Sequence, residues 1–135
     1  MWLLIAVSVL VPLSGCTQPA VDEVNLDTEF TLAVGQTATV AGENLSTKFV
    51  EVVSDSRCPK GATCIWAGEA SCLIELTASD ATLSKVLTQP GPSSPSTATV
   101  AGYDIAFDIL PYPELGKQIA AKDYRLQMVV SKTPA

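Results

Sequence analysis

The chain has 135 residues, which is enough for one domain with a single hydrophobic core and too few for two. Hydrophobic residues make up 47% and charged residues 16%, which excludes disorder throughout, and a net charge of −6 without a Lys/Arg cluster excludes a nucleic-acid-binding surface. The sequence contains no histidine, so Ser–His and Cys–His catalysis and histidine-containing zinc sites are also excluded.

Residues 1–15 predict a signal peptide. Residues 2–13 are an apolar run that is too short to cross a bilayer as a helix but suits the apolar region of a signal peptide. The sequence Leu13-Ser14-Gly15-Cys16 follows and resembles the lipobox of bacterial lipoproteins. This resemblance implies cleavage before Cys16 and fatty-acyl (palmitate-type) anchoring of that residue to a membrane of the cell envelope. The alternative is a buried N-terminal helix with a cysteine placed there by chance.

The residue after the cysteine bears on location. In lipoproteins of Gram-negative bacteria an aspartate at that position tends to retain the protein at the inner membrane. Thr17 stands there in this chain. The same resemblance therefore implies the outer membrane in a Gram-negative cell.

The mature chain divides into a tether and a domain. Residues 16–27 are polar, contain Pro19 and lack a sustained period, so we expect a lipidated N-terminus and flexible tether there. Residues 28–135 alternate between short strand patterns and Gly, Asn, Asp or Ser turns. We expect strands at 29–34, 37–41, 49–53, 70–77, 82–88, 97–101, 103–110 and 124–131.

The connections complete the expected fold. Residues 89–96 carry three prolines and three serines and predict an exposed loop, while residues 113–123 can hold one short helical turn. The density of short strands predicts an all-β domain, namely a single small β-sandwich, Ig-like or jelly-roll-like, with about eight antiparallel strands.

Three cysteines remain after Cys16, in a compartment where disulfides persist. Cys58 and Cys64 enclose five residues, which suits a tight closed loop, and Cys72 lies in an alternating strand, where we expect a small buried hydrophobe. Sequence alone leaves a pairing with Cys72 open. Because the spacing lacks a Cys-x-x-Cys knuckle, we expect no metal site and no cofactor.

The segment 55–70, DSRCPKGATCIWAGEA, resembles a family of small bacterial secreted proteins and lipoproteins with a DSRCPxGxxCxWAG motif. Looser resemblance at 34–36, 110–113 and 123–124 extends it over most of the domain. The resemblance implies an all-β exported domain with a disulfide between Cys58 and Cys64. It implies no reaction, and Cys72 lies outside the motif.

Four side chains near this loop are candidate binding residues: Asp55, Arg57, Trp66 and Glu69. In the interpretation that we favour, Arg57 pairs with Asp55 or Glu69 and Trp66 packs beneath them. In the other interpretation Trp66 is an exposed stacking platform. Because Trp and Arg are enriched at binding hot spots, the loop is in either case the best candidate for a contact surface.

These features predict a lipid-anchored, non-catalytic binding module with an envelope protein or glycan as partner. One alternative is a protease-inhibitor-like module that uses the disulfide loop. A second is an envelope hydrolase with paired carboxylates. Its candidates, Asp104 and Asp108, lie about 13 Å apart along one strand, and we expect both to face solvent.

Overall fold

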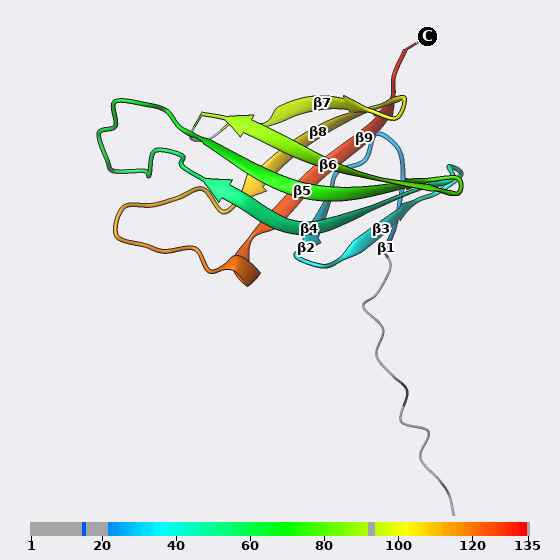
Figure 1. Cartoon of the computed structure of the whole chain (residues 1–135), viewed down its shortest axis with the longest axis horizontal. Helices are drawn as coiled ribbons and strands as arrows, with labels where there is room; N and C mark the ends of the chain where they lie inside the picture. Colours follow the sequence, from blue (N-terminus) through cyan, green and yellow to red (C-terminus); the bar gives the residue numbers. More distant parts are fainter. Residues whose placement is uncertain (1–14, 16–21, 92–93, 135) are drawn as a thin grey trace, which may run out of the picture.

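The structure is a computed structural model that describes residue 15, residues 22–91 and residues 94–134 (Figure 1). The described residues form nine strands and one short 3-10 helix. In chain order these are β1 (Asp22–Val24), β2 (Phe30–Ala33), β3 (Thr37–Val40), β4 (Leu45–Asp55), β5 (Glu69–Ala78), β6 (Ala81–Pro90), β7 (Ser96–Val100), β8 (Tyr103–Leu110), η1 (Ala121–Asp123) and β9 (Arg125–Lys132).

The strands form two sheets, which confirms the predicted all-β sandwich. One sheet has the order β1-β3-β4-β5-β6 and the other the order β2-β9-β8-β7. All neighbouring strands pair antiparallel except β1, which runs parallel to β3 with Asp22 opposite Ala38. Figure 1 shows one sheet lying over the other, with the C-terminus at the end of the sandwich opposite the two long loops.

Alternation along the strands places apolar side chains between the sheets. Both sheets contribute to one buried cluster. Its largest fully buried members are Phe49, Phe107, Leu32, Ile74, Leu76, Leu87, Ile105, Ile109, Leu126 and Met128. Cys72 belongs to the same cluster as a free thiol, which confirms its prediction as a small buried hydrophobe.

Most strand predictions agree with the structure to within one or two residues, and Tyr103–Leu110 agrees at both ends. The main difference in length concerns β4, which has eleven residues instead of the five expected. Its pairing with β5 continues through two register shifts, one after Phe49 and one after Val52. Each shift adds an unpaired residue and interrupts the alternation of side chains between the two faces. The sequence pattern therefore did not indicate the full length of β4.

Two predictions at the domain's margins need correction. The expected tether reached residue 27, but β1 lies within it and continues the first sheet beside β3. The exposed loop was expected at 89–96, but Gln89 is fully buried at the end of β6 and Ser96 begins β7. In both cases, pairing with a neighbouring strand places residues in a sheet although their local sequence carries no strand pattern.

The expected signal peptide up to residue 14 and the expected lipid-attachment residue Cys16 lie outside the described residues. Among the residues that are described, no helix has the length and apolar character needed to span a bilayer.

Candidate functional site

Two loops project together from one end of the sandwich (Figure 1). One runs from the end of β4 to the start of β5, and the other from the end of β8 to the start of β9. Backbone hydrogen bonds join them, because Lys60 N–H donates to Pro113 O at 2.9 Å and Leu115 N–H donates to Lys60 O at 3.0 Å. We call residues 55–70 and 111–124 together the loop end.

The disulfide between Cys58 and Cys64 is present, as the family resemblance implied, and Cys72 does not take part. The two Cα atoms lie 5.9 Å apart. Within the closed loop, Gly61 has a φ of +93°, a conformation that favours glycine. Cys58 N–H also donates to Ala67 O at 2.9 Å, so the strand-proximal part of the loop is a hydrogen-bonded ribbon.

Arg57 is buried at the base of the loop end, with a relative exposure of 3%. Its guanidinium donates from Nε and Nη2 to the two carboxylate oxygens of Asp55, each at 2.8 Å. Its other hydrogen bonds reach the end of β8 at Ile109 O (2.6 Å) and the loop after β8 at Pro111 O (3.1 Å). The predicted pairing of Arg57 with Asp55 is thus confirmed, and it ties the two loops together.

Asp55 has a second partner, Tyr124, whose hydroxyl donates to Asp55 Oδ2 at 2.9 Å. Burial alone would raise the pKa of Asp55, but the hydrogen bonds from Arg57 and Tyr124 outweigh it and hold this pKa below its ordinary value. Burial and the bond to Asp55 raise the pKa of Tyr124 to about 12. The carboxylate is therefore ionised and the phenol neutral at physiological pH.

A second buried polar group lies beside the first. Tyr112 OH donates to Asp108 Oδ2, and Gln89 Nε2 donates to Asp108 Oδ1 at 2.7 Å. Gln89 Oε1 in turn accepts from Ile109 N–H at 2.8 Å. The Tyr112 ring lies 5.8 Å from the Arg57 guanidinium carbon, so the two groups adjoin in a cation–π contact.

This second group corrects the prediction that Asp108 faces solvent, since Asp108 is buried with 7% exposure. Asp104, four residues earlier on β8, accepts hydrogen bonds from Thr99 and Thr133 instead. Because Gln89 and Tyr112 engage both oxygens of Asp108, the two carboxylates do not form the exposed pair that the hydrolase hypothesis requires.

Trp66 does not pack beneath the charged residues, contrary to the interpretation that we favoured. Its relative exposure is 81%, and that of the preceding Ile65 is 94%. We call these two residues the loop tip. Leu115, on the neighbouring loop, is 63% exposed, and its Cβ would lie 3.7 Å from a Cβ added to Gly61. Within the described part of the chain these are the most exposed large apolar side chains.

Glu69 does not join Arg57 either. It is exposed at the start of β5, where its backbone N–H donates to Ser56 Oγ at 3.2 Å. Of the four candidate binding residues, Asp55 and Arg57 therefore build the base of the site, and only Trp66 and Glu69 are available for contact.

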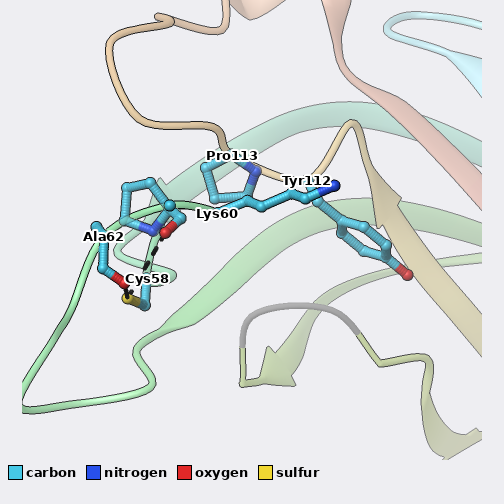
Figure 2. Close-up of a pocket in the computed structure, with 7 residues that line it drawn as sticks. Cys58, Lys60, Ala62, Tyr112 and Pro113 are labelled. Carbon is cyan, nitrogen blue, oxygen red and sulfur yellow. Dashed lines mark hydrogen bonds between the residues drawn. The ribbon is translucent and has the colours of Figure 1, made fainter.

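A pocket of about 500 Å³ opens between the two loops (Figure 2). Its walls are small or apolar, and Lys60 is its one charged lining residue; Figure 2 shows the Lys60 side chain passing Pro113 toward Tyr112. The full lining is Cys58, Pro59, Lys60, Gly61, Ala62, Tyr112 and Pro113. No cluster of three or more Cys, Asp or Glu suited to a metal ion occurs among the described residues.

Sequence reasoning missed Ile65, Leu115 and Tyr112 as parts of the site. Ile65 carried a usable signal, because an aliphatic residue between Cys64 and Trp66 extends an uncharged run at a loop, where polar residues are expected. Tyr112 lies in the segment 110–113 of the looser family resemblance, which gave it no role, and Leu115 carried no signal. The place of both beside the disulfide loop depends on the pairing of distant strands.

Comparison of the chain with models of known protein families, with curated protein sequences and with solved structures gave no match.

Proposed function

We propose that this protein is a lipid-anchored component of the cell envelope and a non-catalytic binding module whose contact surface is the loop tip. The observation that supports it most is the exposure of two adjacent large apolar side chains, Ile65 and Trp66, at 94% and 81%. Trp is seldom left so open to water, and exposed apolar groups gathered at one place mark interaction sites.

The base beneath the tip favours binding. The disulfide and the buried pair of Arg57 with Asp55 restrict the backbone before a partner arrives. A preorganised loop loses less conformational entropy on association than a mobile one, so a small contact area yields more affinity. The anchor rests on Cys16 in its lipobox-like setting, and it places the partner in the envelope.

Site-specific photo-crosslinking tests the contact surface. A photoreactive amino acid at position 66 should give covalent adducts with an envelope component in intact cells. The same substitution at Val53, which is 54% exposed on β4, is the matched control and should give few or none. Equal yields at the two positions would contradict the loop tip as the contact surface.

Intact-mass analysis of the protein extracted from membranes tests the anchor. We expect a chain that begins at Cys16 and carries fatty-acyl groups. Treatment with thiol should raise its mass by the two hydrogen atoms that reduce one disulfide. An unmodified chain that begins at Met1 would contradict the proposal.

A protease-inhibitor-like role is the second candidate, because the exposed Ile65 and Trp66 directly follow Cys64 of a disulfide-closed loop. A rigid loop of this kind can occupy a protease cleft as a wedge. Inhibition within a panel of proteases, abolished by reduction and by Trp66→Ala, would support it. An absence of inhibition across protease classes would contradict it.

A further inference from the structure

The loop end carries no net charge, although the chain as a whole has a net charge of −6. Its four basic residues are balanced by four acidic ones. They are Arg57, Lys60, Lys117 and Lys122 against Asp55, Glu69, Glu114 and Asp123. All of the excess negative charge therefore lies elsewhere on the chain. Anionic lipids repel acidic surfaces within a Debye length, so the loop end is the part best suited to approach a bilayer.

The chemistry of the tip fits lipid better than glycan. Residues 61–68, GATCIWAG, contain no charged side chain, and Thr63 is their one side chain with a hydroxyl or amide group. Glycan recognition needs several polar groups placed around an aromatic ring. By contrast, Trp is enriched at the boundary between lipid headgroups and acyl chains, where an aliphatic neighbour such as Ile65 adds buried apolar area.

The path of the chain brings the anchor within reach of the same surface. Asp22 is opposite Ala38, Ala38 opposite Thr47, and Thr47 opposite Leu76. From the level of Leu76 to Ala70, at the base of the loop end, is six residues along β5, or about 20 Å. Because β1 runs away from the loop end, the chain before it joins at the end of β1 that is nearer the loops.

Five residues, 17–21, separate Cys16 from Asp22 at the start of β1, so six Cα–Cα steps join the two. A chain of that length spans at most about 20 Å. Along the strand direction, this reach brings Cys16 to the level of the base of the loop end, while β1 lies at the edge of its sheet, three strands from β5. The loop tip projects beyond that base, so Cys16 and the tip contact one bilayer together when the domain is tilted with its β1 edge toward the membrane.

We propose that the loop tip inserts Ile65 and Trp66 into the interfacial region of the bilayer that holds the Cys16 anchor. This inference rests on the proposed anchor and names the envelope component that the tip contacts. Two side chains bind a bilayer weakly by themselves. The anchor compensates, because it holds the tip at a high effective concentration beside the membrane and makes the second contact intramolecular.

Trp66 itself reports on the contact, because Trp2 is removed with the signal peptide and Trp66 is then the sole tryptophan. The lipidated protein would be reconstituted in vesicles of phosphatidylethanolamine and phosphatidylglycerol. We expect a blue-shifted Trp66 emission, quenching by lipids brominated on their acyl chains, and severalfold weaker quenching by aqueous acrylamide than for unlipidated Cys16→Ser protein in solution. Because the loop end is neutral, added salt should leave these values unchanged.

Two matched variants complete the test. Ile65→Asp places a charge at the tip and should restore acrylamide quenching while the anchor holds the protein on the vesicle. Val53→Asp, at an exposed position of β4, should behave as the parent protein does.

Failure of the proposed insertion can be distinguished from failure of the proposed anchor. A protein that mass analysis shows to be lipidated, but whose Trp66 is quenched freely by acrylamide, would overturn the insertion and leave the anchor intact. Protection from acrylamide without quenching by brominated lipid would also overturn it, since Trp66 would then be covered by protein. A chain without acyl groups would overturn the anchor and the insertion together.

Discussion

Arg57 holds the carboxylate of Asp55 through two parallel hydrogen bonds of 2.8 Å, from Nε to Oδ1 and from Nη2 to Oδ2. The side chain of Arg57 is completely buried and that of Asp55 is 12% exposed, so neither charge can rely on water. Two further bonds from Arg57 reach the carbonyls of Ile109 and Pro111. A buried ion pair adds little folding stability compared with apolar residues packed in its place. Removal of one partner, however, leaves the other without its hydrogen bonds.

Arg57→Met is therefore expected to destabilise the protein by about 3–5 kcal/mol. The variant leaves Asp55 charged, with only 12% of its side chain exposed, and frees the carbonyls of Ile109 and Pro111. The free energy of unfolding in urea measures the loss. Lys60→Met, at an exposed position of the same loop, is the control and should change it by less than about 0.5 kcal/mol. A loss in Arg57→Met no larger than in the control would show that the buried network does not support the fold.

Stability should also fall in acid because of Asp55. Its folded-state pKa lies below its ordinary value of 3.8, so the unfolded chain takes up the proton first as the pH falls. The stabilisation is complete above about pH 4 and is lost as the pH falls through the folded-state pKa. Measured between pH 7 and pH 2, the free energy of unfolding of Asp55→Asn should start lower and depend less on pH than that of the parent protein.

Glu114 provides the comparison for this pH dependence. Its pKa is also lowered, by a hydrogen bond from Lys117, but this pair is exposed and solvent screens it. Glu114→Gln should therefore retain the acid dependence of the parent protein. If Asp55→Asn retained it too, the acid sensitivity would have to come from another carboxylate.

The strands were the part of the fold that local sequence predicted best. The sequence of Tyr103–Leu110 alternates, because Ile105, Phe107 and Ile109 all enter the core between the two sheets. The burial of Gln89 and Asp108 could not be predicted in the same way. Each is polar, and each is stable inside only because the other, together with Ile109 N–H and Tyr112, satisfies its hydrogen bonds. That match is visible only after β6 and β8 are placed in space.

The site was predictable in its location but not in its geometry. Cysteine spacing and the motif indicated the loop, and the pairing of Arg57 with Asp55 was predicted, yet Trp66 lies outside this pair instead of packing beneath it. Sequence favoured a buried Trp66, because large aromatic residues usually supply apolar packing. In the structure Arg57 occupies the interior, because two backbone carbonyls and a carboxylate there match its planar donors, and Trp66 lies outside.

Cys72 should be unreactive in the native protein. Burial raises the pKa of its thiol to about 12, so almost no thiolate exists near pH 8, and the side chain is inaccessible to reagents. Thiol-specific labelling under non-reducing conditions should be negligible in buffer. It should rise to one group per Cys16→Ser chain in parallel with unfolding in urea. Full labelling of the native protein at pH 8 would contradict the burial of Cys72.

Gly68→Ala should be the most disruptive small substitution in the loop. A Cβ at this position would lie 1.9 Å from Ser56 O and 2.8 Å from Arg57 Cα, and the residue has a φ of +72°. The backbone cannot yield easily, because Ser56 N–H donates to Glu69 O at 2.8 Å and Cys58 N–H to Ala67 O at 2.9 Å. We expect a loss of free energy of unfolding several kcal/mol larger than the roughly 1 kcal/mol of positive-φ strain alone.

Gly116→Ala separates the steric effect from that strain. Gly116 has a φ of +77°, close to that of Gly68, but its added Cβ would meet no atom within 4 Å. The two substitutions therefore impose similar backbone strain, and their difference in urea unfolding isolates the contact of Gly68 with Ser56 and Arg57. Because that contact positions Arg57 beneath the loop, Gly68→Ala should also weaken crosslinking from position 66, whereas Gly116→Ala should not. Equal losses in the two variants would mean that the ribbon at the base of the loop is loose enough to accept a methyl group.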